Sequence, residues 1–270
     1  MMSLHSFAQQ NGSEVYVLKT EIISSRLLGE DRKINIYLPD YYDTSGRTKY
    51  PVIYILDGGV QEDFIHLTGL VRYNSQPWVA RIPESIVVGI ENTNRRKDFT
   101  FAVTDTDFIE KEGFKKESFP QYGNSDNYRA FLEKELQPYI HQNFHVSDDK
   151  TLIGESLAAL MATEILLKQP SLFTNYIIIS PSLWWGERQL LKNAEPLLAE
   201  NLKQKTTVYI GAPSKKEDVR MYRDVRRLFK NLQGNKRLNV SFNYMPDETH
   251  TTVIHQAVYN AFKIWNSQNK

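Results

Sequence analysis

The sequence contains no cysteine and no long apolar run, and its charges almost balance. Without cysteine there is no disulfide scaffold, no thiolate zinc site and no thiol nucleophile. No stretch approaches the roughly 18 to 20 apolar residues that a membrane-spanning helix needs, so no membrane partner is expected. The 33 Lys and Arg residues against 32 Asp and Glu residues give a formal charge of +1. Nothing at the level of the whole chain therefore predicts a nucleic-acid partner.

The start of the chain leaves the cellular compartment open. It lacks the basic-then-apolar order of a signal peptide, so a soluble protein, such as a cytoplasmic one, is expected. Residues 6–10 have small side chains before a polar start, which also fits the remnant of a signal-peptide cleavage region. In that case the protein would be periplasmic or secreted.

The length of 270 residues and the hydrophobic content of 41% suit one large α/β domain, so we expect a single domain over residues 1–270. Strand-like apolar runs alternate with helical patterns along most of the chain. This alternation predicts a mostly parallel central sheet with helices on both faces and right-handed connections. The expected strands are 52–56, 86–90, 151–153, 176–179, 207–210 and 239–244, and the expected helices are 128–143, 157–168, 219–232 and 253–265.

Two regions depart from this alternation. Apolar-alternating stretches at 15–18, 22–28 and 33–38 predict an antiparallel strand group ahead of the parallel strands. Residues 92–124 have no clear periodicity and are longer than an ordinary connection. We interpret them either as a lid or substrate wall, or as a surface excursion with a short helix of its own.

Ser156 stands between a predicted strand and a predicted helix, with Gly154 two residues before it and Ala158 two residues after it. Small residues at these places are typical of a nucleophile elbow, a strained turn that exposes the serine oxygen. The helix that follows stabilises negative charge at its N-terminus, which makes the Leu157 amide an expected oxyanion-hole donor. The usual pattern has glycine where this chain has Ala158. The alternative is a serine that only caps the helix.

A serine nucleophile needs a general base, and chain order narrows the choice among six histidines. In α/β hydrolases the order is nucleophile, acid, histidine, which leaves His250 and His255. His250 lies in a polar loop before the last predicted helix, from which a base can reach over the strand ends. His255 falls inside that helix, where a packed or solvent-facing ring is expected. We therefore predict His250 as the base.

The third catalytic residue should follow the strand 207–210 and orient the imidazole. The loop after this strand carries two carboxylates, Glu217 and Asp218, and no earlier acid. We take Glu217 as the acid and Asp218 as the reserve. The alternative is that both acids only begin the next helix, whose first turn favours negative charge.

Two further groups of residues are expected on the same side of the sheet as Ser156. Trp184 and Trp185 follow a predicted strand, where they either wall an acyl or aryl pocket or pack in the core. Arg95, Arg96 and Lys97 form a basic cluster after the strand 86–90. We expect this cluster either to meet an anionic or catecholate-like ligand or to be a solvated turn.

Over nearly its whole length the chain resembles the putative-esterase branch of the α/β hydrolases. This group includes ferric enterobactin esterase, related siderophore esterases, esterase D and the mycolyltransferases. The resemblance is carried by segments 50–58, 89–95, 154–158, 180–185 and 248–250, in that order along the chain.

The resemblance implies an α/β-hydrolase fold and a serine carboxylic-ester hydrolase that acts through an acyl-enzyme on a siderophore-like or other small ester. It implies Ser156 as nucleophile, His250 as base and the Gly58 amide as the second oxyanion-hole donor, with no metal or organic cofactor. Arg95 occupies the place where the family pattern carries an arginine. An acyltransferase of the same fold and a non-catalytic binding protein are the alternatives, and the oligomeric state stays open.

This chain departs from the family pattern at the acid. Family members commonly carry it soon after the glycine of the seventh strand, where this chain has Ser214 three residues after Gly211. A triad completed by Glu217 or Asp218 and a Ser–His dyad therefore both remain open.

Overall fold

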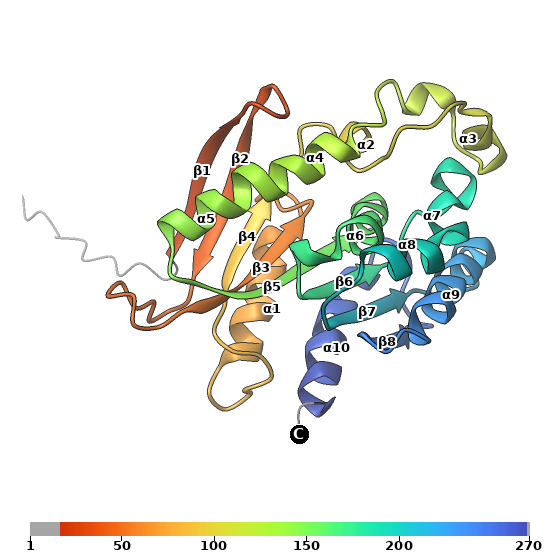
Figure 1. The fold of residues 1–270 in the computed structure, drawn as a ribbon. Helices are drawn as coiled ribbons and strands as arrows, with labels where there is room; N and C mark the ends of the chain where they lie inside the picture. Colours follow the sequence, from red (N-terminus) through yellow and green to blue (C-terminus); the bar gives the residue numbers. More distant parts are fainter. Residues whose placement is uncertain (1–16, 269–270) are drawn as a thin grey trace, which may run out of the picture.

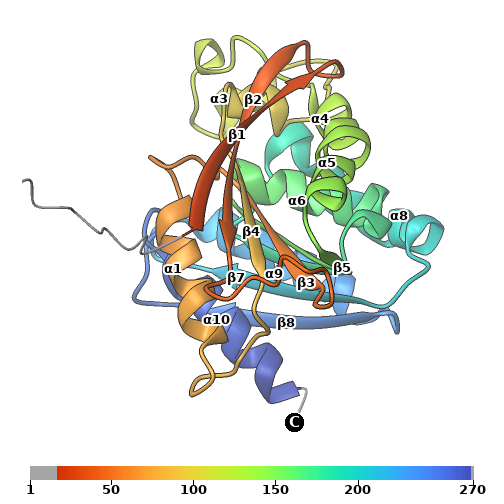
Figure 2. The same ribbon diagram turned by 90° about the vertical axis from the view of Figure 1, so that its left-hand side faces the viewer.

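The computed structural model describes residues 17–268, and within them eight strands form one sheet with helices on both faces (Figures 1 and 2). The strand order is β1-β2-β4-β3-β5-β6-β7-β8. β1 pairs antiparallel with β2, and β2 pairs antiparallel with β4, while all later neighbours are parallel. The strands are β1 (Val17–Ser25), β2 (Glu30–Leu38), β3 (Tyr50–Leu56), β4 (Ile86–Ile90), β5 (Val146–Glu155), β6 (Asn175–Ile179), β7 (Thr206–Ala212) and β8 (Leu238–Tyr244).

The predicted α/β architecture, with a mostly parallel sheet and antiparallel strands at its start, is confirmed. One detail was wrong: residues 17–18 and 22–25, expected in two separate stretches, belong to one strand, and residues 26–28 lie in the turn that follows it. The register of this strand runs without a break from Val17 opposite Leu38 to Ser25 opposite Glu30. Residues 15 and 16, and the stretch 6–10, lie outside the described residues.

Helices cover each face of the sheet because both faces of its central strands are apolar and buried. α1 (Phe64–Ser75) and α10 (Val253–Gln268) share one core with the sheet, and the other helices pack on the opposite face (Figure 1). Those named below are α6 (Leu157–Lys168), α7 (Gln189–Lys192), α8 (Ala194–Asn201) and α9 (Val219–Gln233). No helix between residues 17 and 268 is both long and apolar enough to cross a bilayer.

The helix expected at 128–143 is a continuous rod with a widened turn in its middle. It consists of α4 (Ser125–Phe131), a π-helical turn (Leu132–Leu136) and α5 (Gln137–Asn143). Pro138 stands at the start of α5. Because proline has no N–H and its ring crowds the preceding turn, a locally wider turn accommodates it.

The aperiodic segment 92–124 contains α2 (Arg95–Asp98), α3 (Asp107–Lys111) and a 3-10 turn (Lys116–Ser118). It is anchored to the body of the molecule at two places. The fully buried Asp98 pairs with the fully buried Arg32 of β2. The Trp185 Nε1–H donates to the carbonyl oxygen of Phe101 at 2.9 Å. The segment is thus held against the carboxyl side of the sheet.

Candidate active site

Sharp turns follow three neighbouring parallel strands at the carboxyl edge of the sheet. Asp57 after β3, Ser156 after β5 and Ser180 after β6 have positive φ angles of 56°, 58° and 48°. Residues with a Cβ are strained in this conformation. The turns collect side chains beyond the strand ends, where parallel α/β sheets bind their ligands.

Ser156 sits on a strained strand-to-helix turn with φ 58° and ψ −117°. Its N–H donates to the Ile179 carbonyl at 3.0 Å, which ties the turn to β6. A Cβ on Gly154 would come within 2.6 Å of the Ala158 backbone, so only glycine fits there. Leu157 begins α6, and amides in the first turn of a helix have no acceptor within the helix. The Leu157 amide therefore lies where the elbow pattern predicts an oxyanion donor.

The structure brings Ser156 and His250 together. His250 Nε2 lies 3.1 Å from Ser156 Oγ, although the two residues are 94 positions apart. Burial lowers the pKa of His250, the negative charge of Glu217 opposes this shift and the positive charge of Arg95 adds to it. A neutral imidazole at this distance can accept the serine proton. His255 lies in α10 and stacks on His66, with ring centroids 5.8 Å apart.

The two candidate acids have different partners. Glu217 Oε2 accepts a hydrogen bond from the backbone N–H of His250 at 2.6 Å. Among the described residues, His250 Nδ1 is buried and has no hydrogen-bond partner. Asp218 Oδ1 accepts from the amides of Arg220 and Met221 at 2.8 and 3.0 Å and so caps α9. Glu217 thus holds the loop that carries His250, and Asp218 caps α9.

Ser182 is a contact of Ser156 to which sequence reasoning assigned no role. Its Oγ lies 3.3 Å from Ser156 Oγ, and its N–H donates to the Ser156 carbonyl at 3.0 Å. The signal available in the sequence was its place just after β6, the strand beside β5. Ser182 therefore supports both the backbone and the hydroxyl of the elbow.

The loop after β3, expected to supply a second oxyanion donor, has its amides engaged. The Gly58 N–H donates to the Ile90 carbonyl at 2.9 Å, and the Gly59 N–H donates to Glu62 Oε2 at 2.7 Å. Gly58 has no room for a side chain, since a Cβ would lie 2.4 Å from Gly89 Cα. Its close fit against β4 explains the glycine independently of a role in binding an oxyanion.

Ser156 and His250 open onto a cavity of about 350 Å³. Its walls come from the segment 92–124, the turn after β6, the loop after β7 and helix α9. They include Phe114, Ser182, Trp184, Pro213, Met221, Tyr222 and Val225.

The two predicted tryptophans have separate places. Trp184 lines the cavity and stacks on Phe114, with ring centroids 4.7 Å apart. Trp185 is 0% exposed and lies in the core, where it holds Phe101. Of the two, only Trp184 can touch a molecule in the cavity.

The basic cluster is divided among three partners. Arg95 makes a two-pronged pair with Asp57, at 3.0 and 2.8 Å. The Arg96 guanidinium lies over the Phe119 ring, 5.2 Å from its centroid, and Lys97 lies 3.7 Å from a carboxylate oxygen of Glu30. Arg95 therefore lies beside the turn that follows β3, and its side chain remains 40% exposed.

Acidic side chains gather around Glu155, the residue before Ser156. Burial, together with the charges of Asp63 and Asp57, raises the pKa of Glu155 to about 8. Burial and the neighbouring Asp57 and Glu62 raise the pKa of Asp63 to about 6. The carboxyl group next to Ser156 in the sequence is thus mostly protonated at neutral pH. Among the described residues, these acids do not form a group that could hold a metal ion.

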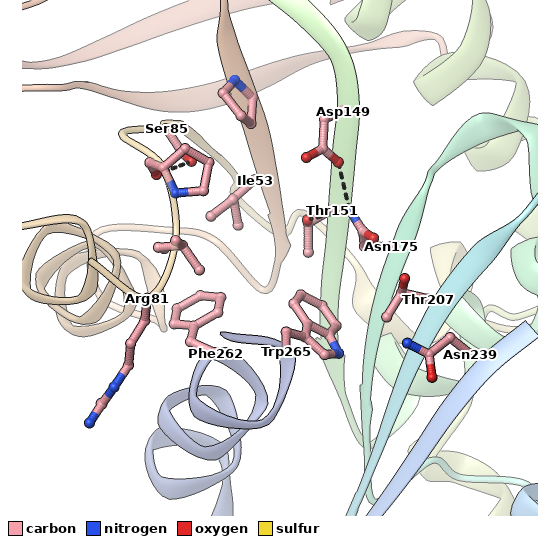
Figure 3. A pocket seen from close by; sticks show the side chains of 13 residues that line it. Ile53, Arg81, Ser85, Asp149, Thr151, Asn175, Thr207, Asn239, Phe262 and Trp265 are labelled. Atoms are coloured by element: carbon pink, nitrogen blue, oxygen red, sulfur yellow. Dashed lines mark hydrogen bonds between the residues drawn. The ribbon is translucent and has the colours of Figure 1, made fainter. Parts of the chain in front are cut away.

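A second cavity, of about 150 Å³, lies at the opposite ends of the parallel strands (Figure 3). Thr151, Asn175, Thr207 and Asn239 stand in one row across β5 to β8. Trp265 of α10 faces this row, and Asn175 Nδ2 donates to an Asp149 oxygen at 2.6 Å (Figure 3). None of its lining residues is a histidine, so it offers no serine–base pair.

Comparison with known proteins agrees with this geometry. Ferri-bacillibactin esterase BesA of Bacillus subtilis (strain 168) is 25% identical over 260 residues, which cover 91% of this chain and 88% of BesA. The crystal structure of an IroE-like serine hydrolase from Shewanella oneidensis has a TM-score of 0.83 at 27% identity, covering 92% of this chain and 79% of that one. The BES protein from Bacillus cereus has a TM-score of 0.80 at 26% identity, covering 97% and 99%.

The family assignment itself comes from a model of the family described as putative esterase. This model matches residues 24–268, which is most of the chain. The protein is thus an α/β-fold member of the putative esterase family.

Proposed function

We propose that this chain hydrolyses carboxylic esters through an acyl-enzyme formed on Ser156. The observation that carries the proposal is the 3.1 Å distance between Ser156 Oγ and His250 Nε2, on a strained elbow at the carboxyl edge of the sheet. A serine that only capped α6 would need no base beside it, and the Ser156 side chain makes no cap hydrogen bond.

The mechanism follows from the positions of these two side chains. His250 takes the hydroxyl proton as Ser156 Oγ attacks the ester carbonyl, and then gives the proton to the leaving alcohol as the ester C–O bond breaks. Water then attacks the acyl-enzyme, with His250 again taking and returning a proton. The oxyanion of each tetrahedral intermediate is stabilised by the Leu157 amide, and such a donor contributes about 3 kcal/mol in comparable sites.

The second oxyanion donor comes from the loop after β3. For Gly58 to serve, its amide would have to leave the Ile90 carbonyl, which lies within the sheet. The Gly59 amide is held by Glu62, an exposed side chain that a substrate oxygen displaces at smaller cost. We therefore propose that this loop supplies the second donor. Gly58 is the residue implied by the family, and Gly59 is the residue whose hydrogen-bond partner is an exposed side chain.

The cavity favours esters with an aryl or other flat apolar group. Phe114, Trp184 and Tyr222 supply aromatic walls next to the nucleophile, and such walls bind rings by stacking and by edge contacts. BesA is named a ferri-bacillibactin esterase, and two fungal relatives that match a shorter part of this chain are named siderophore esterases. A siderophore-like ester is accordingly our first candidate substrate, ahead of other small esters. The segment 92–124 then acts as a substrate wall within a single domain.

The test is hydrolysis of p-nitrophenyl acetate by the wild type and by Ser156→Ala. Turnover should fall by about 10⁴-fold or more in the variant. Its melting temperature should stay close to that of the wild type, because alanine keeps the same strained backbone and little packing is lost. A variant that keeps a substantial part of the wild-type turnover would exclude Ser156 as nucleophile.

A substrate panel defines the activity further. It should contain siderophore lactones, acetylated sugars, S-formylglutathione and short aryl esters. Product analysis with and without an added alcohol separates a hydrolase from an acyltransferase, because only the latter transfers most of the acyl group to the alcohol. Binding without turnover across the panel would indicate a non-catalytic binding protein.

A further inference from the structure

The tip of the segment 92–124 is joined to α9 through Arg188. Arg188 Nη1 lies 2.6 Å from Glu112 Oε1 on the segment, and Arg188 Nε lies 2.8 Å from Asp224 Oδ2 on α9. The three side chains are only 26%, 13% and 14% exposed, in that order. Charges with so little contact with water are screened weakly by salt. Removing Arg188 would leave two little-exposed carboxylates without their cation, which costs more than removing one member of an ion pair on an open surface.

Both ends of the bridge belong to walls of the cavity. Glu112 is two residues before Phe114, whose ring lines the cavity and stacks on Trp184. Asp224 is adjacent to Val225, which lines the cavity from α9.

In Figure 1 α3 lies above α7 and α9, and Arg188 joins Glu112, the residue after α3, to Asp224 of α9. Arg220 of α9 adds a direct link, since its Nη1 lies 3.5 Å from Glu112 Oε2 and donates to the Lys111 carbonyl at 3.4 Å. The Arg188 bridge is thus the shorter of two ion-pair links between these walls.

The backbone that presents Arg188 is strained. Gly186, Glu187 and Arg188 are left-handed in succession, with φ angles of 58°, 52° and 64°. A Cβ on Gly186 would come within 2.6 Å of the Phe101 ring, so the turn begins at the only residue type that fits. Left-handed conformations at residues with a Cβ persist only where the surroundings hold them. Arg188, the last of these three residues, is held by its ion pairs to Glu112 and Asp224.

We propose that Arg188 is a positioning residue that determines ester selectivity. By holding Glu112 and Asp224 together, it keeps the Phe114 wall close to α9 and limits the cavity to one flat group. The inference rests on the proposed esterase function, since it concerns which esters enter. Arg188 is absent from the cavity lining and acts through these neighbours.

The test uses Arg188→Met, which keeps a long unbranched side chain but removes the charge. Glu112→Gln breaks the same bridge far from the strained turn, in case the first variant does not fold. The measured quantity is kcat/KM for p-nitrophenyl 1-naphthoate divided by kcat/KM for p-nitrophenyl acetate. We expect this ratio to rise by about fivefold to tenfold in each variant, mainly through a lower KM for the naphthoate, because the wider cavity admits the larger ring system.

Arg129→Met is the matched control. Arg129 also bridges two carboxylates, Asp126 at 2.8 Å and Glu164 at 3.5 Å, and it does not line the cavity. Its removal should leave the ratio unchanged. Glu112→Gln also loses the pair with Arg220, so the double variant Arg188→Met with Glu112→Gln should show no larger ratio than Glu112→Gln alone.

A measurement without substrate separates this inference from the proposed function. Amide hydrogen exchange over residues 107–119 should become faster in Arg188→Met and stay unchanged in Arg129→Met. A wild type that hydrolyses neither ester would defeat the proposed function while leaving this readout intact. Unchanged exchange, or an unchanged or lower ratio in a folded and active Arg188→Met, would overturn the role of Arg188.

Discussion

Glu217 holds the loop of His250 by its backbone rather than by its ring. The carboxylate accepts from the His250 N–H at 2.6 Å, whereas His250 Nδ1 stays buried without a partner among the described residues. The negative charge of Glu217 still opposes the lowering of the His250 pKa by burial. The same side chain can therefore fix the position of the base and stabilise its protonated form.

Glu217→Gln separates these two effects, because a glutamine oxygen can still accept from the His250 N–H while the charge is lost. We expect kcat to fall by about 100-fold with KM nearly unchanged, since the charge stabilises the imidazolium only as it forms. Asp218→Asn is the matched control and should change kcat little, as asparagine also caps helices. Near-wild-type rates in both variants would indicate a Ser–His dyad, and a reversed result would move the role to Asp218.

The pH profile of kcat/KM should report the burial of His250. Because burial lowers the pKa of His250 and only the neutral ring can accept a proton, the acid limb should have its midpoint below the ordinary value of 6.5. The Glu217 charge raises this pKa, so Glu217→Gln should move the midpoint to lower pH. The Arg95 charge lowers the pKa, so Arg95→Ala should move it to higher pH. Shifts of the same sign in both variants would contradict this assignment.

Arg95 should also distinguish charged from neutral esters. Its guanidinium is 40% exposed beside Asp57, so an anionic substrate can share it. We expect Arg95→Ala to raise KM for anionic esters by about fivefold and to leave neutral short esters almost unchanged, with a difference that shrinks as salt rises. Arg96→Ala is the comparison, because Arg96 lies over Phe119 instead. Equal effects on both ester classes would mean that Arg95 only supports the loop.

Glu155 should make the folded state less stable as pH rises. Its pKa is raised from 4.5 to about 8 by burial and by Asp63 and Asp57. Its contribution to stability is therefore fully present below pH 4.5 and is lost as pH rises through about 8. A glutamine at position 155 cannot ionise. The melting temperature of Glu155→Gln minus that of the wild type should therefore increase between pH 6 and 8 and then stay constant. A constant difference from pH 6 to 9 would show that Glu155 ionises normally in the folded protein.

Much of the site could be predicted because it depends on chain order and turn type. Ser156 and His250 follow strands whose parallel pairing brings their ends to one edge, so their meeting needed no knowledge of loop conformation. Predicting the hydrogen bond of Glu217 did require the loop conformation. Whether its carboxylate meets the backbone or the ring of His250 depends on a few ångströms in two exposed loops.

The walls of the cavity were harder to predict. Trp184 and Trp185 are neighbouring residues of the same type after the same strand, so the sequence pattern could not tell which of them faces the cavity. Phe114 lies in a segment without periodicity, and such a segment gives no sign of which face of it is buried. The single strand β1 was read as two stretches because Thr20 and Glu21 interrupt its apolar pattern on an edge of the sheet.

The positive φ of Ser156 has a consequence for how the protein would respond to selection. A strained non-glycine residue costs about 1–3 kcal/mol, whereas the added chain entropy of a glycine in the unfolded state costs about 0.4–1 kcal/mol. Ser156→Gly should thus melt at a higher temperature than the wild type while losing the proposed nucleophile. A library screened for heat resistance alone would drift towards glycine at this position, so the hydroxyl persists there only under selection for turnover.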